Sequence, residues 1–418
     1  MHSDAFDLVL TGCRLPDGSL ADVGCRGGRV AAIGALAERA ATRTIACGGR
    51  VLTPGLVEAH LHLDKALLSE RTPSVEGTLA EAIRLTAEAK RGFTRDDIRQ
   101  RARAVLDMAL RAGTTAIRGH VEVDPTVGLM GLEAILPLKA EYAAALDLQI
   151  CAFAQEGVLN LPGEEQLLAR ALRQGADLVG GCPYTDTDPL GQIEAIFRLA
   201  REFDVDADFH VDFFDDPEHL HVRAVAERAQ AAGWQGRVAV GHATELGALP
   251  PAEQDTLASA LREAGVGVIV LPATDLYLMG RKDARNVRRG LAPVKRLLAA
   301  GVPVAASSNN VQNAFTPVGN GSLPLMGYLL AVAAHMGTPQ EMRQALGMLT
   351  DQPARILRLP DYGLRPGARA DLVLWDAERL EAVLAAPGPP RLVVKRGRVS
   401  VEHEHEVREP WRRAAGSA

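Results

Sequence analysis

Apolar residues follow two different patterns along this chain. Near both ends, short apolar runs are broken by glycine, as between Phe6 and Ile33 and again in Asp371–Trp375 and Arg391–Lys395. Such runs are typical of short antiparallel strands joined by tight turns. We therefore expect the two ends of the chain to form small β structure and to share one sheet.

Between the two ends, apolar runs alternate with longer amphipathic stretches, which is the pattern of βα units around a parallel sheet. Eight alternations are what a (β/α)8 barrel requires, and eight runs can be counted. They are Gly55–Leu63, Thr114–Val123, Leu146–Gln155, Ala176–Tyr184, Asp206–Phe213, Arg237–Ala243, Gly265–Asp275 and Val302–Asn309.

Polar residues gather at the C-terminal ends of these runs. In a barrel those ends meet at one mouth, where active sites of this architecture lie. The residues concerned include His60, His62, His120, Gln155, Tyr184, His210, His242, Asp275 and Asn309.

Composition narrows the class of protein. The 418 residues include 46 Lys and Arg against 52 Asp and Glu, a net charge of −6, which excludes nucleic-acid binding through bulk charge. The five cysteines are widely spaced, with no CxxC pair. No basic segment followed by an apolar run opens the chain, and no run has the length of a membrane span. The sequence predicts a cytoplasmic protein without a membrane anchor.

The strongest local signal for chemistry is the pair His60 and His62. Residues i and i+2 of a strand face the same side, so both imidazoles can chelate one metal ion. His210 and His242 follow later strands and would complete the set. Each alone is compatible with a structural histidine, but four at the strand ends of one barrel favour a divalent ion.

The stretch Val51–Lys65, with both histidines, resembles the first strand of the amidohydrolase superfamily, and specifically its cytosine deaminase and N-isopropylammelide amidohydrolase branch. The likeness extends over nearly the whole chain. Further matching stretches are Thr114–Asp124, Cys151–Gly157, Phe209–Asp212, Val240–His242 and Gly367–Leu374.

The resemblance implies one metal ion, Zn or Fe, that activates water for attack on a ring carbon bearing an amino group. It implies that His60, His62 and His210 hold the metal, that His242 hydrogen-bonds the metal-bound water, and that Gln155 contacts the substrate's ring amide. A carboxamide can both donate to and accept from such a ring. No carboxylated lysine is needed, so the site should hold a single metal.

The resemblance also implies a fold and partners. We expect an α/β protein in which a (β/α)8 TIM barrel, residues 55–355, carries a small β-sandwich domain formed by residues 1–54 and 356–418. Members of the superfamily often assemble, which makes a homo-oligomer compatible with the sequence. The expected partner is a small heterocyclic substrate, with neither nucleic acid nor membrane.

Two positions depart from the superfamily's pattern. Where the deaminases have a Glu three residues after the ligand His210, this chain has Phe213, which cannot shuttle protons to the ring. Where the superfamily has an Asp after the eighth strand, this chain has Asn309, a neutral amide that cannot accept a proton at neutral pH. Losing both negative charges should weaken metal binding.

Nearby acids are candidates for the missing role. Asp275, near the expected end of the seventh strand, is our candidate base, with a helix cap or loop carboxylate as the alternative. Asp212 lies two residues after His210 and is expected to face inward, toward the substrate. Asp64 and Glu156 adjoin other site residues, and each of these acids could equally be a solvated or paired charge.

Aromatic residues near the ligands complete the expected site. Phe213, Phe214 and Tyr277 could stack on a planar heterocycle, with core packing as the alternative. Lys65 could meet an anionic substrate or pair with a carboxylate. The predicted substrate-binding residues are thus Gln155, Phe213, Asn309 and Asp212.

The predicted function is metal-dependent hydrolysis of non-peptide C–N bonds in a cyclic amidine or amide, with deamination of a planar nitrogen heterocycle first. Hydrolysis of a ring amide or an N-alkyl substituent is the alternative within this class. Because Phe213 and Asn309 replace the usual acids, a catalytically silent barrel that binds a heterocycle is a second alternative. A lyase or isomerase reaction is a third.

Overall fold

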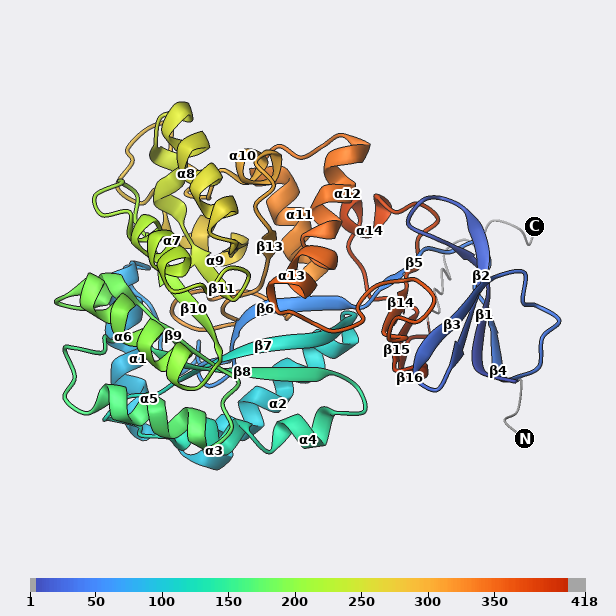
Figure 1. Cartoon of the computed structure of the whole chain (residues 1–418), viewed down its shortest axis with the longest axis horizontal. Helices are drawn as coiled ribbons and strands as arrows, with labels where there is room; N and C mark the ends of the chain where they lie inside the picture. The colour runs from blue at the N-terminus through green and yellow to red at the C-terminus, as the bar shows by residue number, and fades with distance from the viewer. Residues whose placement is uncertain (1–4, 405–418) are drawn as a thin grey trace, which may run out of the picture.

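A parallel eight-stranded barrel forms the body of the protein in the computed structural model, which describes residues 5–404 (Figure 1). Neighbouring strands pair in the order β13-β12-β11-β10-β9-β8-β7-β6. The strands are β6 (Leu56–His62), β7 (Thr114–Glu122), β8 (Asp147–Ala154), β9 (Leu178–Gly181), β10 (Asp206–Val211), β11 (Val238–His242), β12 (Val266–Val270) and β13 (Val304–Ala306).

The barrel closes through backbone bonds made by Asn309, just beyond the last strand. Its N–H donates to the carbonyl oxygen of His60 at 2.9 Å, and its own carbonyl accepts from the N–H of His62 at 2.8 Å. Leu61 and Asn309 form the parallel bridge at this seam. The first and last strands therefore meet beside the histidine pair.

Helices cover the outside of the barrel. Proline in the first turn begins several of them, and threonine, serine or aspartate side chains cap others, because these residues suit a helix start. The helices are α1 (Leu79–Ala89), α2 (Arg95–Arg111), α3 (Met130–Ile135), α4 (Leu138–Tyr142), α5 (Glu164–Arg173), α6 (Pro189–Glu202), α7 (His221–Ala231), α8 (Pro251–Glu263), α9 (Pro272–Leu278), α10 (Val294–Ala299), α11 (Leu323–Ala333), α12 (Pro339–Gly347), α13 (Asp351–Ile356) and α14 (Ala382–Ala385), with the 3-10 turns η1 (Lys90–Gly92), η2 (Pro183–Thr185) and η3 (Thr244–Ala248).

Two small sheets from the chain ends form a separate β unit at one end of the barrel (Figure 1). One sheet has the order β3-β2-β1-β4, and the other, β16-β15-β14-β5, joins a strand from the N-terminal part to three from the C-terminal part. The strands are β1 (Phe6–Arg14), β2 (Leu20–Arg26), β3 (Arg29–Gly34), β4 (Ala41–Ala46), β5 (Leu52–Pro54), β14 (Leu372–Leu374), β15 (Leu392–Lys395) and β16 (Arg398–Glu402).

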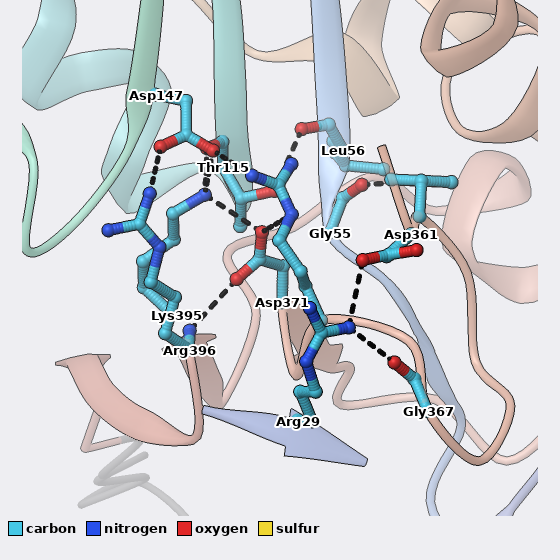
Figure 2. Close-up of polar contacts among 12 residues, drawn as sticks. Arg29, Gly55, Leu56, Thr115, Asp147, Asp361, Gly367, Asp371, Lys395 and Arg396 are labelled. Atoms are coloured by element: carbon cyan, nitrogen blue, oxygen red, sulfur yellow. Dashed lines mark hydrogen bonds and ion pairs between the residues drawn. The ribbon is translucent and has the colours of Figure 1, made fainter. Parts of the chain in front are cut away.

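A buried charge network joins this β unit to the barrel (Figure 2). The Lys395 ammonium donates to the Thr115 carbonyl oxygen at 2.9 Å and to the carboxylates of Asp147 and Asp371 at 2.8 Å each. Thr115 and Asp147 lie at the starts of β7 and β8. The β unit therefore packs against the N-terminal end of the barrel and leaves the opposite mouth free for chemistry.

The structure confirms the predicted fold class, with two local differences. The seventh strand is shorter than the predicted run Gly265–Asp275. Pro272 follows the end of β12 and begins α9, so Asp275 lies on a helix. The N-terminal sheet is not wholly antiparallel, since β1 pairs with β4 in parallel. Among the described residues, no helix has the length and apolar character needed to cross a membrane.

Candidate metal centre and active site

Three histidines from two strands converge at the mouth of the barrel. The Nε2 atom of His210, on β10, lies 3.0 Å from the Nε2 atoms of both His60 and His62, on β6. All three side chains are buried. This is the trio predicted as metal ligands, and the fold brings their ring nitrogens to one point.

Strand geometry explains the convergence. Because side chains alternate along a strand, His60 and His62 both face the barrel interior, as does Glu58 two residues earlier. Gly241 on β11 makes room for His60, since a Cβ atom there would lie 3.1 Å from the imidazole Cε1 atom. A larger residue at this position would push the ring away from the trio.

The environment of the trio suits a divalent cation. Burial lowers the pKa of all three histidines well below the usual value, so their rings are neutral at pH 7. Each neutral imidazole has only one N–H, so hydrogen bonding alone cannot satisfy three nitrogens that face one another. A metal that accepts three nitrogen lone pairs, each at about 2.1 Å, can do so. The Oδ1 atom of Asn309 is also buried without a partner.

Asp275 binds His242. The Oδ1 atom of Asp275 lies 2.7 Å from the Nδ1 atom of His242, and its Oδ2 atom accepts the Leu271 N–H at 3.0 Å. Burial raises the pKa of this carboxyl group, and His242 opposes that shift. An ionised Asp275 accepts from Nδ1–H and leaves a lone pair on Nε2 of His242. Asp275 therefore acts on the pocket through His242 rather than by direct contact.

Backbone strain gathers at this mouth. His242 has a φ of 69°, Asn309 a φ of 60° and Asp212 a φ of 51°, all in the left-handed region that non-glycine residues rarely adopt. These residues lie just after or at the ends of β11, β13 and β10. Strain of this kind costs about 1 kcal/mol or more per residue and often accompanies functional geometry.

The trio opens into a small inner pocket. Besides His62, His210 and His242, its wall includes Lys65, Gln155 and Asn309. The ammonium of Lys65, which is 1% exposed, donates to the Gln155 Oε1 atom at 2.9 Å. Lys65 thus hydrogen-bonds an amide on the pocket wall, and its charge opposes the rise that burial causes in the pKa of the Glu122 carboxyl group.

Phe213 covers His242. The two rings stack with centroids 3.7 Å apart and planes at 25°. Phe213 also lines the inner pocket, as predicted for a substrate-contacting residue, whereas Phe214 is 39% exposed and lies outside it. Tyr277 packs under the Arg281 guanidinium, 4.6 Å from its ring centroid, so it is not part of the inner wall.

The structure places Asp212, predicted to contact substrate, away from the wall of the inner pocket. Its two carboxylate oxygens accept the N–H groups of His221 at 2.7 Å and Val222 at 3.0 Å, at the start of α7. The side chain is fully buried and absent from the pocket wall. The left-handed backbone at Asp212 breaks the strand alternation, and the helix start takes the carboxylate.

The other acids near the mouth also have structural partners. Asp64 accepts the Glu122 N–H at 2.8 Å, and Glu156 accepts from Lys90. Neither lines the inner pocket. The described part of this wall therefore carries no carboxylate, and Asp275 lies behind His242, which does line it.

Sequence reasoning missed two buried acids behind the trio. Glu58 accepts the backbone N–H of Ser308 at 3.1 Å, and Asp208 holds Arg118 at 2.9 Å and lies 3.9 Å from the Nδ1 atom of His60. Each lies two residues before a predicted ligand, His60 or His210. Strand alternation would have placed both on the inward face.

Three convergent imidazoles beside a histidine–carboxylate pair suit metal-activated hydrolysis, and proteins similar to this chain are amidohydrolases and deaminases, which act on C–N bonds other than peptide bonds. The model of the Amidohydrolase family matches residues 43–401. This chain therefore belongs to the amidohydrolase family, and both the family and the group formed by His60, His62 and His210 support a divalent metal.

Several known proteins are similar over most of their length. N-isopropylammelide isopropyl amidohydrolase from Pseudomonas sp. (strain ADP) is 28% identical, covering 96% of this chain and 99% of that protein. Pterin deaminase from Rhizobium rhizogenes is 30% identical, covering 83% and 79%. The crystal structure of 5-methylcytosine deaminase from Klebsiella pneumoniae liganded with 5-fluorocytosine superposes with a TM-score of 0.92 at 31% identity, covering 96% and 100%.

Proposed function

We propose that this protein hydrolyses an exocyclic C–N bond of a planar nitrogen heterocycle and releases ammonia or an amine. The observation that carries the proposal is the 3.0 Å convergence of the His60, His62 and His210 Nε2 atoms beside His242 in one pocket. The names of the similar proteins, which include a pterin deaminase and a 5-methylcytosine deaminase, support a heterocyclic substrate.

One metal ion, Zn or Fe, fits the donor set of His60, His62 and His210. When bound there, it lowers the pKa of a coordinated water to about 7 and polarises the bond under attack. Two other groups of metal-ligand type already contain a cation of the protein: Arg118 binds Asp208, and Lys90 binds Asp124 at 2.6 Å. Because a positive side chain already occupies each of those two groups, the arrangement supports a single metal ion at the histidine trio.

The protein's own residues would then handle the proton and the ring. His242 takes the proton of the attacking water at Nε2, and Asp275 stabilises the resulting imidazolium through Nδ1. The same nitrogen gives this proton to the ring nitrogen next to the attacked carbon, and His242 then moves the remaining hydroxyl proton to the leaving amine as the C–N bond breaks and the C=O bond forms. Gln155 holds a ring amide, and its orientation is fixed by Lys65. This shuttle replaces the acid whose position Phe213 occupies.

Elemental analysis and amine release test the proposal together. We expect about one equivalent of metal per chain and chelator-sensitive release of ammonia or amine from a panel of aminopyrimidines, aminotriazines and pterins. His62→Gln should abolish both, whereas the control His335→Gln, at an exposed histidine, should change neither. Metal without any amine release from the panel would contradict the proposal.

One observation favours a second candidate, hydrolysis of a ring amide. The described wall of the inner pocket carries the Lys65 ammonium and the amides of Gln155, Asn309 and Asn310, with no carboxylate. Such a wall suits a carbonyl oxygen and the negative charge that it gains under attack better than a protonated amidine.

Product analysis separates the two candidates. Ring opening adds water to a cyclic amide without releasing ammonia, and mass spectrometry of the product detects it. Lys65→Met should slow ring opening by about 100-fold, because it removes one electrostatic stabiliser of the developing charge. A product that has lost nitrogen would exclude ring opening for that substrate.

A further inference from the structure

A large chamber adjoins the inner pocket on its outer side. The inner pocket measures about 10 Å³, room for about one water molecule. The chamber measures about 550 Å³, within the usual range for small-molecule sites. The inner pocket is too small for a heterocyclic ring and its substituents, so substrate must occupy space on both sides of the wall between the two.

Two aromatic rings form that wall. Tyr184, on η2 after β9, and Phe213, after β10, line both the inner pocket and the chamber. Tyr184 also contacts Phe214 edge-on, with ring centroids 5.3 Å apart. A substrate that reaches the three histidines therefore passes between or displaces these rings, and whatever extends outward lies in the chamber.

Part of the chamber surface beyond the rings is apolar. Leu79 and Ile83 of α1 face Leu278 and Met279 at the end of α9, and Phe214 adds a half-exposed ring. Leu79, Ile83 and Leu278 pack in one hydrophobic cluster with Phe213. Charged residues line the chamber as well, among them Asp215, Asp216 and Arg281.

Asp215 and Asp216 each have a partner. Asp215 accepts the Gly280 N–H at 2.7 Å, and Asp216 pairs with Arg288 at 2.8 Å. The Arg281 side chain donates to the Tyr277 carbonyl oxygen at 3.0 Å and stacks on that ring. Glu218 and Lys282 also line the chamber. Its apolar part, formed by α1 and the end of α9, is the part that packs with Phe213 of the aromatic wall.

We propose that this chamber binds an apolar substituent of the substrate, an alkyl or aryl group carried by the ring or by the leaving nitrogen. The inference rests on the proposed function, because it treats the inner pocket as the reaction centre. Phe213 and Tyr184 then contact the substrate where the substituent is attached to the reacting ring. Phe213 thus determines specificity at the position where an acid is missing.

Alkyl hydroxamic acids test the chamber without a known substrate. Acetohydroxamic, butanohydroxamic, hexanohydroxamic and octanohydroxamic acids carry one metal-binding head and tails of increasing length. Calorimetric titration of the zinc-loaded protein should show affinity rising about threefold per added methylene beyond butanohydroxamic acid. Affinity that does not depend on tail length would overturn the proposal.

Two variants on α1 make the test specific. Ile83→Asn places an amide in the chamber and should flatten the dependence on tail length while leaving acetohydroxamate affinity unchanged. Leu85→Asn is the matched control, because Leu85 is a half-buried leucine of the same helix that does not line the chamber. Equal slopes in the two variants would contradict the assignment.

A second probe does not depend on the metal. N-phenyl-1-naphthylamine is a neutral molecule whose fluorescence increases in apolar surroundings, and we expect it to bind with or without zinc. Ile83→Asn should weaken this binding at least threefold relative to Leu85→Asn, and no difference would overturn the proposal. If both probes behave as expected but no panel substrate releases amine, the apolar binding site is supported and the proposed hydrolysis is contradicted.

Discussion

The two ends of this barrel differ in how far their buried polar groups are satisfied by hydrogen bonds. At the N-terminal end, the three N–H donors of Lys395 meet three acceptors, so the buried ammonium is fully satisfied (Figure 2). At the mouth, the Nε2 atoms of His60 and His62 both face Nε2 of His210 at 3.0 Å, and the Asn309 Oδ1 atom has no hydrogen-bond partner among the described residues. Buried polar groups are normally paired. The N-terminal end, called the barrel base below, therefore contributes mainly to stability, whereas the mouth has polar groups available to bind a ligand.

The largest expected effect comes from the mouth. His210→Asn should remove the metal and lower kcat/KM by at least about 1000-fold, because the loss of the metal removes several kcal/mol of transition-state stabilisation. The melting temperature without metal should also fall, because the buried His210 ring packs on Phe153 with centroids 4.1 Å apart and its Nε2 atom contacts His60 and His62. Elemental analysis, steady-state kinetics and thermal unfolding check these results, and wild-type activity in the variant would contradict the comparison.

The base should show the reverse behaviour. Lys395→Met leaves Asp147 and Asp371 without their shared ammonium, so the free energy of unfolding should fall by about 3 kcal/mol. The kcat/KM of the folded protein should stay unchanged. Urea unfolding measures the loss, with Lys139→Met at a half-exposed pair as a control that should cost less than about 1 kcal/mol. An equal loss in both variants would show that burial adds nothing.

Asp275 joins the mouth through His242. Asp275→Asn removes the charge that supports an imidazolium, and we expect kcat to fall by about 100-fold with KM nearly constant. The pH profile of kcat should change shape, which a purely structural role would not cause. Unchanged kinetics would place the proton shuttle elsewhere.

A substitution of Asn309 should increase the affinity of the mouth for metal. Asn309→Asp turns an unpartnered amide oxygen into a carboxylate beside the histidine trio and should tighten metal binding about tenfold. Competition with a chelator measures this affinity, with Asn310→Asp as the neighbouring control. Unchanged affinity would show that the Asn309 side chain does not face the metal.

Glu164 gives an effect that depends on pH, because neither of its buried carboxylate oxygens has a hydrogen-bond partner among the described residues. Burial, with Asp124 nearby, raises its pKa to about 9 from an ordinary value near 4.5. The folded protein then keeps a proton that the unfolded chain releases, so stability is lost as the pH rises from about 4.5 to about 9.

Glu164→Gln should remove this dependence. Its advantage in unfolding free energy over the wild type should grow by about 1 kcal/mol between pH 6 and pH 7 and level off above the raised pKa. Glu165→Gln, at a more exposed carboxylate that pairs with Arg198, is the control and should show no such trend. Parallel pH curves for Glu164→Gln and the wild type would contradict the assignment.

The barrel and the histidine trio could be predicted from the sequence because both depend on local periodicity. Eight apolar runs define eight strands, and the spacing of His60 and His62 defines a face. Asp212 could not be placed, because its left-handed backbone turns the side chain toward α7. The partner of Asp275 could not be found either, since a helix that begins at Pro272 sets its direction.

The pocket wall depends on contacts that no local pattern encodes. Lys65 meets Gln155 from another strand, and Phe213 stacks on His242 only after β10 and β11 have paired. The chamber outside the inner pocket forms only where α1 and α9 come together. A cytoplasmic location and a homo-oligomer remain predictions of the sequence.

The seam at Asn309 ties the metal centre to the completion of folding. His60, His62 and His210 all precede β13 in the chain, but β6 has an open edge until the Asn309 backbone bonds to His60 and His62. A nascent chain therefore contains all three histidines before it contains the strand that holds β6 in place. Metal uptake would then report that synthesis has reached the last strand and that the barrel has closed.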